Sequence, residues 1–263
     1  MRKNIRNTAA AAACVVMLFA CRKNVSTEQT LTPSDEALSK IYALGFSNKN
    51  VTMDEEGNYL VEGDISLSEA DLNAAPETRF LRVGSAEQYR TYNLVTRLPR
   101  VITVSISKLP GSYTAALDEA IGRYNAENLQ ITFKRVNSKG NIAIVKAGGN
   151  YLASSGFPTS GGDPYNQVKV NSGAIGSQPQ STVASILAHE IGHCIGFRHT
   201  DYMDRSYSCG GQAVNEGAST VGAVFIPGTN PDPDPNSFML SCIGSGDNRP
   251  FNANDKIALA YLY

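Results

Sequence analysis

The chain has 263 residues, which is enough for one sizeable domain with an appendage or for two small domains. Its charge is nearly balanced, with 23 basic and 24 acidic residues, and no cluster of lysine and arginine contradicts that balance. This composition excludes a nucleic-acid-binding surface, so we expect no nucleic-acid partner.

Residues 1–20 are predicted to be an export signal. They begin with basic residues and continue with an apolar stretch that is too short to span a bilayer as a helix. The stretch ends in Leu18-Phe19-Ala20-Cys21, which resembles a bacterial lipoprotein cleavage box, although Phe19 is unusual at its position. We therefore expect Cys21 to be lipidated and to anchor the protein at the outer membrane or cell surface, with release after processing left open. Ordinary secretion with Cys21 unmodified is the alternative.

Residues 21–95 are predicted to form an N-terminal segment, of which residues 22–75 are polar and turn-rich. Its apolar runs are short and lie at 41–44 and 59–61. This composition predicts a small, weakly packed segment, which would suit a propeptide that is removed from the mature protein.

Regular secondary structure is predicted from about residue 100 onward. The β-branched stretch 101–106 predicts a strand, and apolar residues at helical spacing after Pro110 predict a helix. The patterns that follow predict three more strands, at 129–136, 141–145 and 167–170. The span 149–180 is rich in glycine, serine and proline, and the next helix is predicted to begin near Ser181 as its N-cap.

That helix carries the pattern H-E-x-x-H-x-x-G-x-x-H, which uses all three histidines of the chain. His189 and His193 are one helical turn apart, so both imidazoles can bind one ion. Gly196 can adopt a left-handed backbone that ends the helix, which allows His199 to supply a third nitrogen. Three protein ligands leave a fourth position open, as in a catalytic zinc site, and Glu190 is placed to act on the water there.

We therefore predict a zinc endopeptidase in which Glu190 activates a zinc-bound water against a peptide bond. The substrate would be an extracellular or envelope protein, lying extended along an edge strand near 150–172. Two alternatives remain. One is a lipid-anchored binding or adhesion protein whose zinc helix is structural, and the other is a zinc amidase that acts on cell-wall peptide. The open fourth position and the presence of Glu190 favour the peptidase.

Three cysteines follow Cys21. An exported protein meets an oxidising compartment, so one pair can form a disulfide. Cys194 projects from an apolar stripe of the motif helix, where a small buried thiol is the usual outcome. Cys209 and Cys242 are then the expected disulfide pair.

The extended motif and the elements before it resemble the metzincin zinc peptidases. The resemblance is stronger to the bacterial dual-action HEIGH metallopeptidases, whose name is spelled by residues 189–193, and it covers roughly residues 100–263. It implies an α+β fold for a catalytic domain of residues 96–263, with a twisted mixed β-sheet and an active-site helix. It also implies one catalytic zinc, a methionine turn at Met239 and a closing helix capped by Asn252 or Asn254.

A second resemblance concerns Val61-Glu62-Gly63-Asp64-Ile65, which is similar to the F-x-G-D segment of astacin-type propeptides. It implies that Asp64 occupies the zinc position and keeps the enzyme latent. An ordinary Gly-Asp turn is the alternative interpretation. The long connection between His199 and Met239 departs from matrixins, so the substrate specificity of relatives does not carry over.

We expect a monomer whose partner is a protein or peptide substrate. Calcium is a further cofactor that the loops allow but do not support. Gly161-Gly162-Asp163 and the stretch 230–234 supply loop carboxylates and carbonyls, but neither has a recognised ligand spacing, so both are predicted to be turns.

Overall fold

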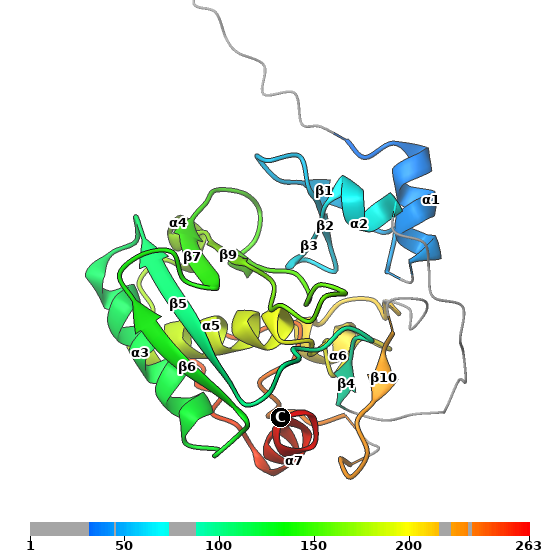
Figure 1. The fold of residues 1–263 in the computed structure, drawn as a ribbon. Coiled ribbons are helices and arrows are strands. Elements are labelled where there is room, and N and C mark those ends of the chain that lie inside the picture. The colour runs from blue at the N-terminus through cyan, green and yellow to red at the C-terminus, as the bar shows by residue number, and fades with distance from the viewer. Residues whose placement is uncertain (1–31, 45, 74–87, 216–221, 231–232) are drawn as a thin grey trace, which may run out of the picture. The chain divides into compact units, whose positions relative to one another are not determined.

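The computed structural model describes residues 32–44, 46–73, 88–215, 222–230 and 233–263, which are drawn in colour in Figure 1. The compact unit that contains them runs from Leu31 to Tyr263. The predicted signal at 1–20 and Cys21 lie outside the described residues. Within the described ranges, no helix combines the length and the apolar composition needed to cross a membrane.

A mixed sheet of five strands forms the centre of the fold, in the order β6-β5-β7-β9-β8. Its first four strands in that order pair in parallel, and only β8 at the edge is antiparallel. The strands are β5 (Arg100–Ser107), β6 (Ile131–Val136), β7 (Ile142–Lys146), β8 (Ala153–Ser154) and β9 (Gln167–Val170). The four strands predicted for this region are confirmed, and the antiparallel edge lies where an edge strand was expected.

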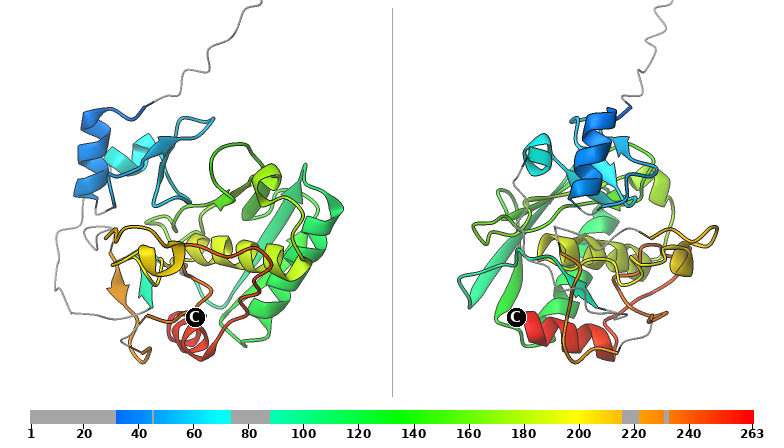
Figure 2. Two further views of the ribbon diagram at one scale, coloured as in Figure 1. Left: turned by 180° about the vertical axis from the view of Figure 1, so that it is seen from behind. Right: turned by 90° about the vertical axis from the view of Figure 1, so that its right-hand side faces the viewer.

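Two long helices, α3 (Gly111–Asn125) and α5 (Gln180–Cys194), pack against each other and against the sheet (Figure 2). Their apolar faces meet the inward-facing residues of the strands in one core, in which Ile102, Leu117 and Leu187 are completely buried. Burial of whole aliphatic side chains stabilises such a core by about 1.5–3 kcal/mol each. This packing buries α5 along nearly its whole length and therefore holds the motif helix in a fixed position.

The start of α5 differs from the prediction. Pro179, and not Ser181, precedes the first helical residue, and Ser181 lies inside the first turn. The pyrrolidine ring holds φ of Pro179 at −52°, which prepares the chain for a helix without any side-chain cap.

The C-terminal part contains short elements and a closing helix. The closing helix α7 (Ala253–Leu262) begins after Asn252, whose side chain accepts from the backbone N–H of Asp255, while the side chain of Asp255 accepts from the backbone N–H of Asn252. Asn252, and not Asn254, is therefore the cap. The remaining elements of this part are α4 (Ser172–Ile175), α6 (Ser206–Cys209) and β10 (Val224–Phe225), which pairs with β4 (Tyr89–Arg90).

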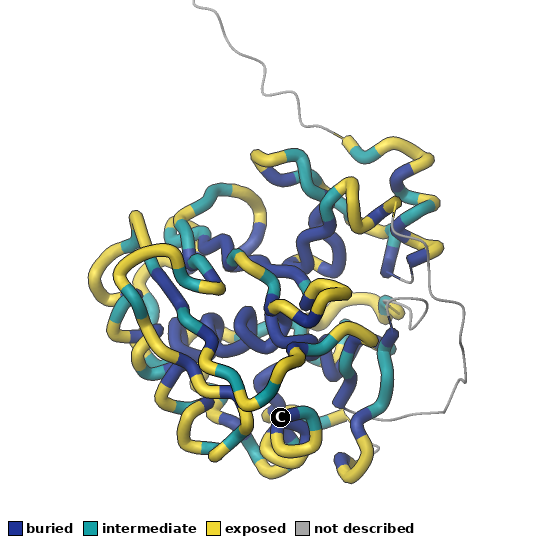
Figure 3. Tube along the Cα trace, in the orientation of Figure 1, coloured by how far each residue is buried: buried dark blue, intermediate teal, exposed yellow. Residues whose placement is uncertain are grey.

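The N-terminal segment is more closely packed than its composition predicts. It forms α1 (Asp35–Ala43), the three-stranded sheet of β1 (Thr52–Met53), β2 (Tyr59–Val61) and β3 (Ile65–Leu67), and α2 (Glu69–Asn73). These elements share an apolar cluster in which Ile41 and Val61 are fully buried. The turn between β2 and β3 is buried as well (Figure 3), apart from Gly63. Because this turn is buried, it must contact residues outside the N-terminal segment.

Candidate metal centre

The three histidines of the motif converge at the C-terminal end of α5. His189 and His193 belong to the helix, which ends at Cys194. Gly196 then takes a φ of +108°, and a Cβ there would come within 3.0 Å of the Asn93 carbonyl oxygen. This left-handed residue lets the chain turn back, and it brings Nε2 of His199 to 3.2 Å from Nε2 of His193.

Two backbone carbonyls orient the imidazoles. Nδ1 of His189 lies 2.9 Å from the carbonyl oxygen of Phe238, and Nδ1 of His193 lies 2.8 Å from that of Phe197. A carbonyl only accepts, so Nδ1 carries the proton in both rings and Nε2 keeps its lone pair. Nε2 of His189 is buried and has no hydrogen-bond partner. Burial and the two neighbouring histidines lower the pKa of His193 well below its ordinary value, which favours the neutral ring that binds metals.

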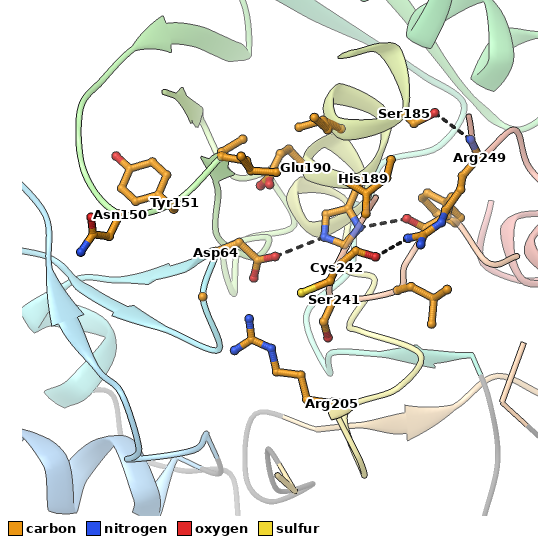
Figure 4. A pocket seen from close by; sticks show the side chains of 17 residues that line it. Asp64, Asn150, Tyr151, Ser185, His189, Glu190, Arg205, Ser241, Cys242 and Arg249 are labelled. Carbon is orange, nitrogen blue, oxygen red and sulfur yellow. Dashed lines mark hydrogen bonds and ion pairs between the residues drawn. The ribbon is translucent and has the colours of Figure 1, made fainter. Parts of the chain in front are cut away.

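Asp64 from the N-terminal segment completes a set of four donors. Its Oδ2 lies 3.1 Å from Nε2 of His199. The same oxygen lies 3.5 Å from Nε2 of His189, and Figure 4 shows this second contact. All four donor atoms lie within 4.8 Å of one another. Zinc with bonds of about 2.0–2.1 Å in a tetrahedron places neighbouring donors roughly 3.3 Å apart. The four residues therefore fit a zinc ion, with the carboxylate at the fourth position.

The charge of Asp64 is matched to this position. Burial alone would oppose its ionisation, but the adjacent His199 holds the pKa of its carboxyl below the ordinary value. An ionised carboxylate is the form that binds a metal.

Glu190 is the other buried carboxylate of the site. Its Oε2 accepts a hydrogen bond of 2.7 Å from the hydroxyl of Ser155, which follows the edge strand β8. Burial, together with the nearby carboxylate of Asp64, raises the pKa of Glu190 well above its ordinary value. The sequence offered no signal for Ser155, because it lies in a span whose glycines, serines and prolines suggest only turns.

Met239 is buried directly beneath the motif helix. A Cβ on Gly192 would come within 2.6 Å of the Met239 sulfur, so this position of the motif must remain glycine for the turn to pack there. The same turn supplies the Phe238 carbonyl that orients His189, and its Met239 carbonyl accepts from the N–H of Thr200 at 2.9 Å. The turn thus supports both ends of the histidine set.

Residues 62–66, here called the blocking segment, lie along the free edge of the sheet. Ile65 and Ser155 form a parallel bridge. The N–H of Ser66 donates to the Ser155 carbonyl at 2.7 Å, and the N–H of Ser155 donates to the Asp64 carbonyl at 2.9 Å. An extended peptide would need these same backbone groups to join the edge strand.

A buried ion pair anchors the blocking segment. One nitrogen of the Arg198 guanidinium donates to both carboxylate oxygens of Glu62 at 2.8 Å, and both side chains are completely buried. The guanidinium also lies over the ring of Phe46, 4.9 Å from its centroid. This pair was missed in the sequence, where its partners are 136 residues apart. Arg198 precedes His199, so the anchor and the metal centre share one stretch of backbone.

A disulfide joins Cys209 and Cys242 across 33 residues, and Cys194 is a buried free thiol. Replacing Cys209 and Cys242 together by serine should lower the free energy of unfolding by about 2–4 kcal/mol, because the crosslink restricts the unfolded chain. Urea unfolding followed by circular dichroism measures the change. Cys194→Ala is the control, because it keeps the crosslink. The urea concentration at the midpoint of its unfolding should still fall when reductant is added. A double serine variant as stable as the oxidised wild type would contradict the prediction.

The two loops considered for calcium are engaged by nitrogen donors. Asp163 forms ion pairs with Arg97 and Arg100. Asp234 accepts hydrogen bonds from the side-chain amides of Asn252 and Asn254. In the part of the chain that the structure describes, the single group of metal-ligating side chains is the histidine set with Asp64.

Comparison with known proteins gives one family and several solved structures. The model of the dual-action HEIGH metallo-peptidases matches residues 59–263, a range that includes the blocking segment as well as the histidine motif. No curated protein matches the chain significantly.

The similar solved structures include two of myroilysin. One is 16% identical, with a TM-score of 0.43, and the match covers 65% of this chain and 82% of myroilysin. The other is 15% identical, with a TM-score of 0.42 and coverages of 68% and 91%. High choriolytic enzyme 1, a hatching enzyme zinc-protease from the medaka fish Oryzias latipes, is 23% identical, with a TM-score of 0.27 and coverages of 38% and 44%.

Proposed function

The chain belongs to the dual-action HEIGH metallopeptidase family, and from this premise we propose that it is a zinc endopeptidase which its own N-terminal segment keeps latent. One observation carries the proposal. The Nε2 atoms of three histidines converge beside Glu190, and the carboxylate of Asp64 closes the fourth position. This arrangement has both the donors of a hydrolytic site and a group that prevents a substrate from entering it.

In this proposal His189, His193 and His199 hold one zinc ion, which supplies a Lewis acid for the peptide carbonyl and lowers the pKa of water. Glu190 takes a proton from the attacking water and delivers it to the leaving amine. The Ser155 hydroxyl fixes the Glu190 carboxylate in place for both transfers. The backbone N–H and carbonyl of Ser155 bind the extended substrate once they no longer bind residues 64–66.

Latency follows from three sets of contacts that the blocking segment makes. Asp64 takes the fourth position at the metal centre, the backbone of 64–66 occupies the sheet edge, and Glu62 pairs with Arg198. Removal of the N-terminal segment, or its release, would open all of these groups to a substrate. The interpretation of Val61–Ile65 as an ordinary turn does not account for the contact between Asp64 and two histidines.

The substrate is proposed to be an extracellular or envelope protein. The basic and apolar pattern of residues 1–20 and the position of Cys21 support export and lipid anchoring. The Cys209–Cys242 disulfide supports an oxidising compartment. Acyl-chain analysis of the N-terminal peptide by mass spectrometry tests the anchor, and an unmodified Cys21 in the membrane fraction would contradict it.

Metal removal tests the activity. The full chain carrying Asp64→Ala should bind one zinc ion and hydrolyse denatured casein. A chelator should abolish hydrolysis, and one equivalent of zinc should restore it, because the three histidines remain to bind the ion. Zinc content and released peptides are measured together. A chain that binds zinc but cleaves neither casein nor gelatin after removal of residues up to 73 would contradict the proposal and favour a binding protein.

A further inference from the structure

A cavity of about 270 Å³ lies beside the metal centre (Figure 4). Its walls come from Ser185 and Ile186 of α5, from Leu152 next to the edge strand, and from Cys242 and Ile243 after the methionine turn. The cavity is smaller than the roughly 300–1,000 Å³ of sites for drug-sized ligands. Its volume suits a single side chain of an extended peptide.

The cavity lies on one side of the metal centre. His189 and Glu190 line it, while His193 and His199 do not. In the proposed mechanism Glu190 delivers a proton to the leaving amine. The residue of the substrate that carries this amine, the one after the scissile bond, is therefore the residue whose side chain faces the cavity.

Arg249 gives the lining of the cavity a positive charge. Its guanidinium donates to the carbonyl oxygen of Cys242 at 2.6 Å, and no carboxylate among the described residues lies within ion-pairing distance of it. Asp247 and Asp201 are near enough to stabilise the charge, but their carboxylates accept from Gly244 and from Ser241 respectively. An arginine has five donor N–H groups and stays charged, so donors remain for a ligand.

The rest of the lining does not neutralise this charge. The carboxylates that line the cavity are Asp64 and Glu190, and both are engaged at the metal centre. A second arginine, Arg205, also lines it, with its guanidinium against Gly63 of the blocking segment. Departure of that segment would take the Asp64 carboxylate away, so the lining of the cavity would become less negative. The charge balance of the open cavity then favours an anionic side chain.

We propose that this cavity selects substrates with aspartate or glutamate directly after the scissile bond, and that Arg249 is the residue that determines this specificity. The inference rests on the proposed function and names its substrate class. A guanidinium and a carboxylate form paired, charge-assisted hydrogen bonds, which are stronger than bonds between neutral groups. The half-buried position of Arg249 limits competition from water.

Paired peptides test the inference. The full chain, released from latency by Glu62→Ala and Asp64→Ala, is given peptides that differ only in the residue after the scissile bond, which is glutamate, glutamine, leucine or lysine. Mass spectrometry locates the cut. We expect kcat/KM for glutamate to exceed that for glutamine by roughly 10- to 100-fold. Arg249→Met should bring this ratio close to one, Arg249→Lys should keep part of it, and Arg249→Glu should favour lysine.

The ratio separates specificity from structure, because a merely destabilised enzyme would lose both activities together. Arg97→Met, which removes a surface arginine paired with Asp163, is the control and should leave the ratio unchanged. If Arg249→Met does not fold, the inference is decided by the glutamate-to-glutamine ratio of the wild type and by that of Arg249→Lys. Efficient cleavage with a glutamate-to-glutamine ratio near one would overturn the inference alone. A zinc-loaded chain that cleaves no peptide would overturn the proposed function as well.

Discussion

Replacing Glu190 by glutamine is expected to lower kcat for peptide hydrolysis by about 10²- to 10⁴-fold while zinc content stays at the wild-type level. Glutamine has nearly the same shape, and its carbonyl oxygen can still accept the hydrogen bond from Ser155. It cannot take a proton from water at neutral pH. The metal ligands are untouched, so the loss falls on the chemical step and not on zinc binding.

The measurement compares kcat and zinc per chain for Glu190→Gln and its parent, both carrying Asp64→Ala. Ser155→Ala is the graded comparison, since it keeps the carboxylate and removes only the hydroxyl that positions it. Its loss should be the smaller of the two. Undiminished hydrolysis by Glu190→Gln would exclude Glu190 as the general base, and lost zinc would place its effect on the metal site.

Replacing Glu62 by alanine should activate the unprocessed chain by roughly two to three orders of magnitude. Loss of one partner from a buried ion pair costs about 3–5 kcal/mol, because the other charge stays buried without the carboxylate that paired with it. That cost falls only on the latent arrangement, in which Arg198 is completely buried. Release of the blocking segment lets water reach Arg198, so the variant favours the open form.

Two further variants test whether the activation depends on the ion pair between Glu62 and Arg198. Asp64→Ala should activate the chain about 10- to 100-fold, since it removes charge-assisted contacts at the metal centre but keeps the anchor. Glu56→Ala removes an exposed carboxylate that pairs with Lys169, but the buried Lys169 keeps its ion pair with Asp54, so the variant should change little. Hydrolysis is followed at early times with mass spectrometry confirming that the chain is intact. Equal effects of Glu56→Ala and Glu62→Ala would show that the ion pair has no special role.

Local patterns in the sequence were enough to predict the histidine motif and the main strands. The spacing of His189, His193 and Gly196 depends on one helix and its end, and the β-branched stretch at 101–106 depends on itself. Features of this kind are determined by residues that are close together in the sequence, so they can be predicted without knowledge of the rest of the fold. The α+β fold with its mixed sheet, its motif helix and its closing helix is confirmed for the same reason.

What the sequence could not predict depends on contacts between distant segments. Strand β8 has two residues and exists only because it pairs with β9, so no periodicity marks it. The bond from Ser155 to Glu190 follows from that pairing. The pair of Glu62 with Arg198 and the position of Arg249 in the cavity likewise need the folded chain, although a lone arginine inside the apolar motif was a local sign that a partner exists.

The blocking segment offers the metal centre a side chain and not a peptide bond. The carbonyl of Asp64 is held by the N–H of Ser155, while only its Oδ2 faces the histidines. The enzyme does not cleave a blocking segment of this kind, because no peptide bond of the segment lies at the metal centre. It is also tethered to that enzyme, so its local concentration does not fall when the protein is diluted. Onset of activity would then be set by a cut elsewhere in the chain or by the loosening of the anchor, and not by how many molecules meet.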